Sequence, residues 1–443
     1  MGSDGSFLAG TDIPGAGPGP GPSQSPGNSG PAQGESATTL NIDTPETAAA
    51  AGLAATALRD AALLAAGYDY DGAIALLNET PGISGTVEVR AKIEEYEQIK
   101  TTLVRVNPVT VTHVFFHSLV MDNALAFDGD SREKGYNQVM TTKSEFMKII
   151  QSMYDRGYVL VRLHDLAYEV KDADGGVSFK GGDVMLPPGK TAFVMSQDDV
   201  CYYDYMKGDG FATRMVVGDD GKPTCEMELA DGSVVTGAYD LVPLLEEFIE
   251  SHPDFSYRGA RAVIAFTGYE GILGYRTATS YSDSPTYASD RKEAARVAQA
   301  LRDAGWELAS HSWGHLNMGA ISYEKFKTDT DKWESEVESL IGPTDIILFP
   351  FGSDIGDWKP YTHENERYDY LYRQGFRYFC NVDSSVNWVQ LGKDSYRQGR
   401  RNLDGYRMYY DIIQPDLTKR KTEDLFHAED VFDPDRPTPV PPM

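Results

Sequence analysis

The sequence predicts an α/β protein built on an irregular barrel of parallel strands that helices cover. Three observations support this prediction. From residue 109 onward, short β-rich segments alternate with helical segments, an order typical of repeated β-α-β units. Polar clusters directly follow two of the predicted strands, as catalytic groups do in parallel α/β domains. Apolar residues make up 41% of the 443 residues, which is enough for a sizeable core.

The first part of the chain lacks this alternation. Residues 1–43 are rich in Gly, Pro and Ser and show no apolar period, so we expect a flexible linker there. The Thr-Pro-Glu run that begins at Thr44 supplies an N-cap, an N1 proline and a first-turn acid. It opens a small helical region over residues 44–108, in which we expect three helices, the first Ala-rich and ended by Gly67.

The main domain is expected at residues 109–425, followed by a Pro-rich and disordered tail at residues 426–443. Its helices are predicted where apolar residues recur with helical spacing, and its strands where β-branched and aromatic residues cluster. In one helix Thr142 and Glu145 form a capping box, and Gly157 follows its end. The expected strands cover residues 111–116, 158–161, 192–195, 306–309, 345–349 and 377–382, and the expected helices between them cover residues 142–156, 290–304, 322–340 and 365–374.

Two segments interrupt the alternation. Residues 211–236 carry Asp-Gly turn signals between β-prone runs, which predicts an inserted β-hairpin or small meander within about residues 208–260. Residues 265–287 are rich in Gly, Tyr, Ser and Thr, the composition of a long surface loop.

Composition argues against several classes of function. The formal net charge of −27 argues against binding to nucleic acid or to anionic lipid. The chain has only three cysteines and no C-x-x-C pair, so a disulfide framework or a cysteine zinc site is not expected. No uninterrupted apolar stretch reaches about 18 residues, and we therefore expect no transmembrane segment.

The two polar clusters contain residues that can bind a metal. Asp198 and Asp199 follow one predicted strand, and His311 and His315 follow another. Imidazoles four residues apart fall on one face of a helical turn and can share one ion, while one carboxylate binds it and its neighbour acts as a base. Two histidines and one aspartate leave coordination positions open, as catalytic sites do. On the residues alone, the alternative is a pair of structural or exposed histidines, and the Asp-Asp pair is the weaker signal because Asp219-Asp220 repeats it inside a turn.

The order of these motifs resembles the polysaccharide deacetylases of the NodB type, carbohydrate esterase family four. An Asp-Asp pair after a strand, a His-Ser-x-x-His motif after a later strand, and Phe349-Pro350-Phe351-Gly352 succeed one another as in that family. The similarity covers most of residues 110–408, apart from the insertion. It implies the family's irregular (β/α) barrel and the removal of N- or O-linked acetyl groups from a polysaccharide.

The resemblance also implies a role for each motif residue. Asp199, His311 and His315 would hold one divalent transition metal, most often Zn²⁺, and Asp198 would be the base that deprotonates the attacking water. Phe351 would present its backbone N–H to the oxyanion and its ring to the sugar.

Three further positions are expected to contact the substrate. Gln197 stands where the family usually has an aromatic residue, and with Pro350 it is expected to contact the sugar. Trp388 lies in a segment that resembles the family's tryptophan motif, which would place it against the acetyl methyl group. The alternative for Trp388 is a core tryptophan.

Two functional groups of the family are absent from their usual places. Leu348 stands where the family has an arginine that orients the base, and Arg401 and Arg276 are candidate replacements. The late Leu-x-His that supplies the general acid is missing, and His427 lies in a charged tail. Some members of the family look circularly permuted, with the catalytic histidine on an early strand, so we assign the general acid to His117. The alternative is a histidine bonded only for structure.

The predicted function is hydrolysis of an acetylated glycan by a metal-dependent enzyme. We expect an extracellular or cell-envelope location, with the linker as a possible tether to the cell surface, although the chain begins without the features of a signal peptide. Two alternatives stay open. One is a catalytically silent carbohydrate-binding protein on the same scaffold, and the other is a glycosidase that uses paired acids such as Asp198 and Glu270.

Overall fold

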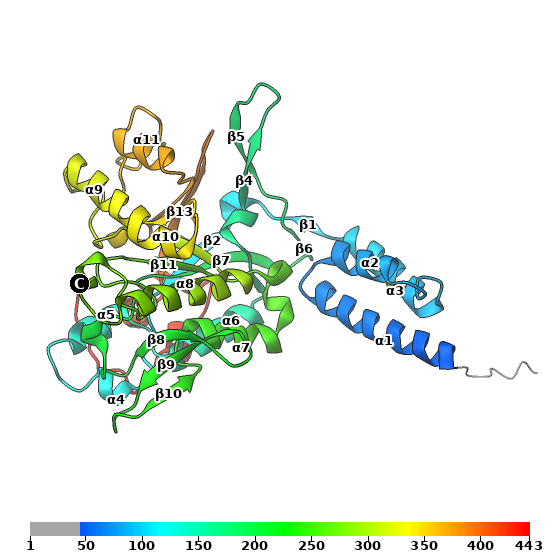
Figure 1. Ribbon diagram of the computed structural model, residues 1–443, viewed down its shortest axis with the longest axis horizontal. Coiled ribbons are helices and arrows are strands. Elements are labelled where there is room, and N and C mark those ends of the chain that lie inside the picture. Colours follow the sequence, from blue (N-terminus) through cyan, green and yellow to red (C-terminus); the bar gives the residue numbers. More distant parts are fainter. Residues whose placement is uncertain (1–44) are drawn as a thin grey trace, which may run out of the picture. The chain divides into compact units, whose positions relative to one another are not determined.

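The computed structural model describes residues 45–443, with side chains from residue 49 onward. The predicted linker at residues 1–43 lies outside the described residues. Three helices come first, shown in blue in Figure 1: α1 (Pro45–Ala66), α2 (Tyr70–Glu79) and α3 (Val87–Lys100). By length and composition, the window Ala49–Ala66 of α1 could cross a membrane, since its mean hydropathy is 1.3. The window contains Arg59 and Asp60, so it is not an uninterrupted apolar stretch, and this one helix is weak evidence for a membrane span.

Seven parallel strands form a closed barrel. Each pairs with the next, and the last pairs with the first. In order around the barrel they are β2 (Thr112–Phe116), β7 (Thr191–Gln197), β11 (Val263–Phe266), β12 (Glu307–Ser310), β13 (Ile346–Leu348), β14 (Tyr378–Val382) and β16 (Tyr396–Asn402). The closed parallel arrangement confirms the predicted (β/α) barrel.

The barrel is irregular beside β7. Strand β3 (Tyr158–Leu160) pairs with the beginning of β7, and β11 pairs with its last two residues, Ser196 and Gln197. Along β7 the side chains alternate between two sides. Phe193 and Met195 pack with the apolar residues of the covering helices, whereas Ala192 and Val194 pack with residues of neighbouring strands.

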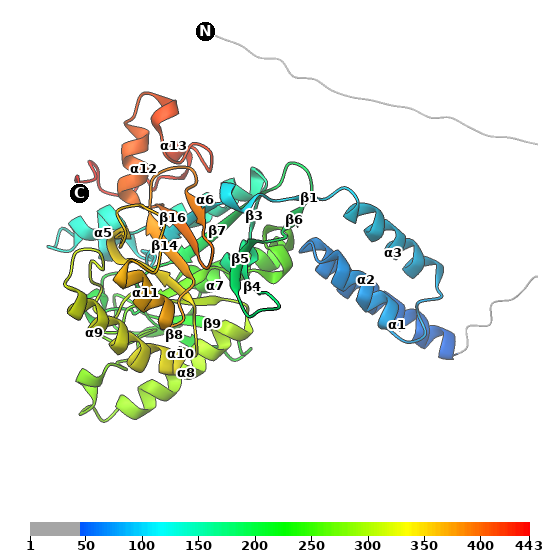
Figure 2. The same ribbon diagram turned by 90° about the horizontal axis from the view of Figure 1, so that it is seen from above.

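Helices surround the strands (Figures 1 and 2). The longer ones are α6 (Lys143–Asp155), α7 (Leu241–Ser251), α8 (Tyr287–Asp303), α9 (Tyr323–Trp333), α11 (Glu366–Arg373) and α12 (Gly405–Ile412). The shorter ones are α4 (Asn123–Ala126), α5 (Glu133–Val139), α10 (Ser339–Ile341) and α13 (Ala428–Val431). Helix α6 begins with the predicted capping box of Thr142 and Glu145. It buries Phe146 and Ile149 completely, and each such side chain stabilises the fold by about 1.5–3 kcal/mol.

The remaining strands lie outside the barrel. The insertion forms the predicted meander of β8 (Ala212–Val217), β9 (Pro223–Glu228) and β10 (Val234–Gly237). The sequence did not indicate the hairpin of β4 (Ala167–Lys171) and β5 (Val177–Gly181), the pair β1 (Val104–Arg105) and β6 (Met185–Leu186), or β15 (Val389–Leu391), which pairs with β16. These strands are short and several are largely exposed, so they lack a sustained apolar alternation.

Residues 265–278 are mostly buried, which corrects the prediction of a surface loop there, whereas residues 279–287 are exposed or half-buried, as predicted. Ile272, Leu273 and Tyr275 belong to the main core. Gly274 has a φ of +87°, and a Cβ at this position would lie 2.5 Å from the Cα atom of Arg214. The glycine therefore permits a close backbone approach rather than an exposed turn.

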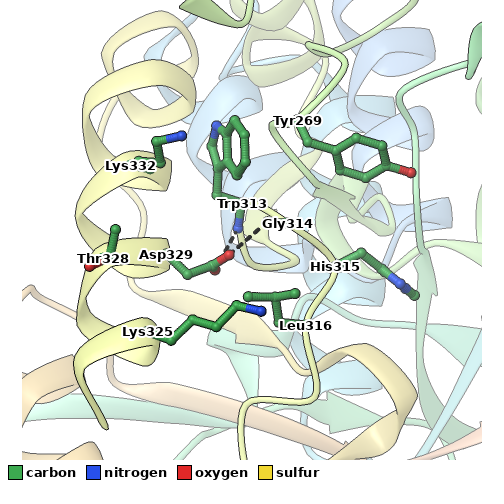
Figure 3. Close-up of a pocket in the computed structure, with 9 residues that line it drawn as sticks. All are labelled: Tyr269, Trp313, Gly314, His315, Leu316, Lys325, Thr328, Asp329 and Lys332. Atoms are coloured by element: carbon green, nitrogen blue, oxygen red, sulfur yellow. Dashed lines mark hydrogen bonds between the residues drawn. The ribbon is translucent and has the colours of Figure 1, made fainter. Parts of the chain in front are cut away.

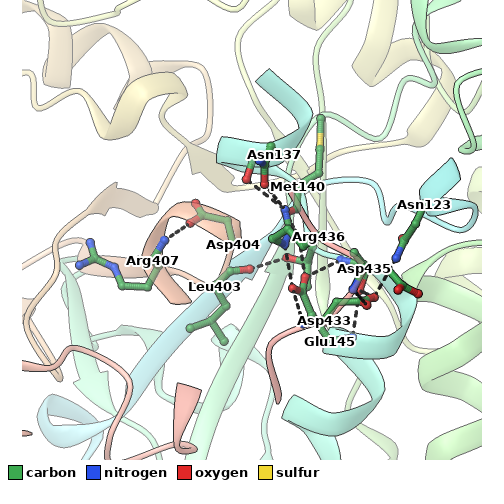
Figure 4. Close-up of polar contacts among 12 residues, drawn as sticks. Asn123, Asn137, Met140, Glu145, Leu403, Asp404, Arg407, Asp433, Asp435 and Arg436 are labelled. Atoms are coloured by element: carbon green, nitrogen blue, oxygen red, sulfur yellow. Dashed lines mark hydrogen bonds and ion pairs between the residues drawn. The ribbon is translucent and has the colours of Figure 1, made fainter. Parts of the chain in front are cut away.

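The C-terminal tail is ordered, contrary to the expectation of disorder. Arg436 and Glu145 are fully buried, and their side chains approach to 2.5 Å (Figure 4). The guanidinium also donates to the backbone carbonyls of Asn137 and Met140, each at 3.0 Å. The tail is fixed both by this buried ion pair and by the apolar side chains of Phe426, Ala428 and Val431, which belong to the main core.

Candidate metal centre and active site

The two predicted polar clusters meet at the carboxyl ends of the barrel strands. Asp198 and Asp199 follow β7, and His311 follows β12 in a loop that continues to His315. Ligand atoms of Asp199, His311 and His315 all lie within 4.8 Å of one another. The Nε2 atom of His315 is 3.6 Å from Oδ2 of Asp199. Three potential metal ligands, from the segments that follow two strands, therefore converge on one position where an ion could bind.

The donor set fits a divalent transition metal. Nδ1 of His311 donates to the backbone carbonyl of Leu348 at 2.7 Å, and this bond leaves Nε2 directed at the carboxylates. Burial lowers the pKa of His311, so its imidazole is neutral at pH 7. Two imidazoles and one carboxylate are the ligands of many catalytic zinc sites, which keep an open position for water or substrate.

Asp198 is a buried carboxylate with an arginine partner. Oδ1 accepts a 2.6 Å hydrogen bond from Nη1 of Arg400, and Oδ2 lies 3.8 Å from Nε2 of His311. Burial alone raises the pKa of Asp198, but the charge of Arg400 and its hydrogen bond outweigh this effect and hold the pKa at about 2. Asp198 is therefore ionised at neutral pH, as a base must be.

Neither predicted arginine occupies this position. Arg401 pairs with Asp424 at 2.7 Å, and Arg276 donates to the carbonyl of Tyr202 at 3.0 Å. Successive side chains on β16 point to opposite sides, so Arg400 reaches Asp198 while Arg401 points away from it. Arg400, the residue before the predicted Arg401, is thus the arginine that contacts Asp198.

His117 lies on the same edge of the barrel, after β2. Its Nε2 atom is 4.0 Å from Oδ2 of Asp199, and its side chain is 20% exposed. Nδ1 bonds to the carbonyl oxygen of Val139 at 3.1 Å. Because this bond uses the Nδ1 proton, Nε2 is the nitrogen that can exchange a proton with the site. His113, on β2 itself, is fully buried between Gln398 and Ser196.

Two predicted substrate residues lie together beside the cluster. Phe351 is 68% exposed, and its ring lies edge-on to that of His315 with 4.6 Å between centroids. Pro350 precedes it and is buried. Phe351 therefore offers an open aromatic surface next to a candidate metal ligand.

The other two predicted substrate residues lie elsewhere. Gln197 is fully buried, and its amide donates to Asp240 at 2.9 Å, which suits a supporting role beneath the site rather than contact with a sugar. Trp388 packs against Trp358 and the guanidinium of Arg397. Within residues 49–443, Trp388 makes no aromatic or cation–π contact with the Asp/His cluster.

Sequence reasoning missed Tyr203. Its hydroxyl donates to Oδ1 of Asp199 at 2.8 Å and contacts Oγ1 of Thr267 at the same distance. The bond to Tyr203 leaves Oδ2 of Asp199 directed at the histidines. A tyrosine close to an Asp-Asp motif is too common a pattern to have indicated this role.

Four site residues have the left-handed backbone conformation that favours glycine. The φ angles are +59° at Asp199, +57° at Ser312, +49° at His315 and +57° at Phe351. Each costs about 1–3 kcal/mol, a strain that proteins concentrate at functional sites. The surrounding barrel must compensate for this cost.

Residues 112–402 thus form a parallel α/β barrel with a candidate Asp/His/His metal centre at the carboxyl ends of its strands. Residues 277–368 match the family model for polysaccharide deacetylase, and this segment includes both histidines and Phe351. The match confirms the resemblance to polysaccharide deacetylases. No curated protein sequence matches the chain.

Two solved structures share similarity with the chain. One is the Streptococcus pyogenes deacetylase PplD in complex with acetate, at 10% identity and a TM-score of 0.36, covering 67% of this chain and 93% of that chain. The other is a protein from Bacillus anthracis assigned as a polysaccharide deacetylase, BA0330, at 9% identity and a TM-score of 0.37, covering 71% of this chain and 69% of that chain.

Proposed function

We propose that this chain is a metal-dependent deacetylase that removes acetyl groups from a polysaccharide. The observation that carries the proposal is the convergence of Asp199, His311 and His315 beside an ionised Asp198. The family match over residues 277–368 supports the same reaction.

Each polar group then has a task. Asp199, His311 and His315 would hold the ion, which we propose to be Zn²⁺. Such an ion, when bound, supplies Lewis-acid activation of water and of the acetyl carbonyl. Asp198 takes the proton from the attacking water, and Arg400 occupies its Oδ1, so that Oδ2 is the proton acceptor.

Departure of the sugar requires a proton donor on the same rim. His117 gives the proton from Nε2 to the amine or alcohol as its bond to the acetyl carbon breaks, and acetate is the second product. The bond from Nδ1 to Val139 holds the imidazole in this orientation. Phe351 donates its backbone N–H to the oxyanion and offers its exposed ring to the sugar.

The substrate we propose is an acetylated glycan of the cell envelope or the extracellular space. The exposed ring of Phe351 supports a polymer that passes over the rim of the barrel. The Gly-, Pro- and Ser-rich composition of residues 1–43 suits a tether to a cell surface.

Acetate release tests the proposal. The substrates are chitooligosaccharides, peptidoglycan fragments and acetyl-xylan, each with the metal-depleted protein and with the protein after Zn²⁺ is restored. We expect acetate from at least one substrate, and only with metal. A silent carbohydrate-binding protein would bind a substrate without releasing acetate, and a glycosidase would produce new reducing ends without needing metal.

A further inference from the structure

A pocket opens next to the candidate metal centre and shares His315 with it. It lies between the loop Trp313–Leu316 and helix α9, and its volume is about 470 Å³ (Figure 3). Tyr269 forms part of its wall on the side of His315. A group attached to the sugar that undergoes deacetylation can therefore extend from the metal centre into this pocket.

The loop that lines the pocket is held rigidly. Asp329 is buried, and its carboxylate accepts hydrogen bonds from the backbone N–H groups of Trp313 and Gly314, both at 2.8 Å. The indole N–H of Trp313 donates to Glu336 at 3.0 Å. The carboxylate of Asp329 is therefore already bonded to the loop, and the pocket has its shape before any ligand arrives.

Two lysines of α9 give the pocket a wall of net positive charge, since two lysines and one acidic residue, Asp329, line it. Lys325 and Lys332 are seven residues apart, which places them two turns apart on the same side of the helix. Among residues 49–443, no carboxylate lies within ion-pair distance of either ammonium group. Lys332 instead lies 3.8 Å from the centroid of the Trp313 ring, a cation–π contact that holds its charge in the pocket.

A positive wall is unusual in a chain with a net charge of −27. The rings of Tyr269 and Trp313 offer surfaces on which a sugar can pack, and the ammonium groups lie beside them. A neutral polymer would leave both ammonium groups without an ion pair. An anionic substituent on the glycan would pair with them close to the site of hydrolysis.

We propose that this pocket binds an anionic substituent, a carboxylate or a phosphate, carried by the acetylated glycan next to the acetyl group that is removed. The inference rests on the proposed function and adds to it that the substrate is an acidic polysaccharide. Lys325 and Lys332 determine this specificity.

The test compares three oligosaccharides that carry the same acetamide: chitotetraose, carboxymethylated chitotetraose and phosphorylated chitotetraose. We expect kcat/KM to be higher for at least one anionic form than for the neutral form, and the two anionic forms distinguish carboxylate from phosphate. In the double variant Lys325→Gln/Lys332→Gln, the ratio of anionic to neutral kcat/KM should fall about tenfold, which corresponds to about 1.4 kcal/mol.

Lys327→Gln is the matched control. Lys327 lies on the same helix but pairs with Glu324 at 3.0 Å and does not line the pocket. It should leave the ratio unchanged. Equal rates on all three substrates, or a loss of the preference in Lys327→Gln as large as in the double variant, would overturn the inference.

A binding measurement separates this inference from the proposed function. The inactive variant Asp198→Asn is titrated with the three oligosaccharides by calorimetry, with and without the two lysine substitutions. Tighter binding of an anionic form that depends on the lysines supports the pocket even if no acetate is released, in which case only the proposed reaction fails. Equal affinity for all three forms, together with acetate release, leaves the reaction standing and removes the pocket.

Discussion

Arg400 and Asp198 form a hydrogen-bonded ion pair that is almost completely shielded from water, with 2.6 Å between Nη1 and Oδ1. The guanidinium also lies over the ring of Phe115, 4.5 Å from its centroid. This pair keeps the carboxylate ionised in an environment that would otherwise protonate it.

Replacement of Arg400 by methionine should make the reaction sensitive to acid. In the parent the pKa of Asp198 is about 2, so the base is ionised at every pH above this value. Without the guanidinium, burial raises this pKa, and the rate should fall as the pH decreases toward it. The measurement is the pH dependence of kcat/KM, with Arg401→Met, whose partner is Asp424, as the control on the same strand.

Loss of Arg400 also leaves a buried charge without a partner, which typically costs about 3–5 kcal/mol of stability. The profiles are therefore recorded at a temperature at which circular dichroism shows the variant to be folded. If kcat/KM of Arg400→Met decreased toward acid pH in the same way as that of the parent, the proposed role of this pair would be contradicted.

Substitutions of the two adjacent aspartates should affect different properties, Asp198→Asn the proton transfer and Asp199→Asn the metal binding. Asp198→Asn should keep about one divalent ion per chain but lose activity by about 10²–10⁴-fold, because an amide cannot accept the proton of water. Asp199→Asn should lose the ion, as should His311→Ala. Elemental analysis and acetate release check both properties, and exchanged phenotypes of the two Asn variants would require the two roles to be exchanged.

His117→Ala should keep its metal, measured by elemental analysis, and lose activity in the acetate-release assay. A general acid delivers a proton to the departing amine or alcohol, and an alanine side chain has none to give. The variant should be at least about 100-fold slower, the usual contribution of a positioned acid. His427→Gln is the control, since His427 is half-exposed and pairs with Glu423 outside the cluster. A His117→Ala variant within about threefold of the parent would remove His117 from the mechanism.

Phe351→Gly should be more stable than Phe351→Ala. The φ of +57° at this position costs an alanine about 1–2 kcal/mol, whereas glycine adopts it freely. Both variants lack the exposed ring and should lose activity to a similar extent. Urea unfolding measures the difference in stability, and an alanine variant as stable as the glycine variant would show that this conformation is not strained.

Five of the seven barrel strands and the positions of the candidate metal ligands could be predicted, because both depend on local patterns, whereas β11 and β16 were not among the expected strands. Buried strands of β-branched and aromatic residues end in Asp-Asp and His-x-x-x-His, and in a parallel barrel the ends of the strands meet. Contacts between distant segments leave no such pattern. Arg400 differs from Arg401 only by the side of β16 to which it points, and Tyr203 contacts Asp199 only because of the left-handed turn between them.

That the C-terminal tail is ordered could not be predicted, for a similar reason. A single arginine in a Pro-rich segment has no periodicity, and its partner, Glu145, already had a role in the capping box of α6. Gln197 shows the opposite case, in which a motif position suggested contact with substrate but the side chain is bonded to the buried Asp240.

The contacts of Arg436 also bear on the order in which the active site is completed during synthesis. Arg436 bonds to the carbonyl of Met140 (Figure 4), and the neighbouring carbonyl, that of Val139, accepts the bond from His117. Strand β2 and His117 leave the ribosome long before Arg436 does. The segment that accepts the bond from His117, the proposed proton donor, therefore gains its own bonds to Arg436 only when the last residues of the chain have been made, after all the barrel strands.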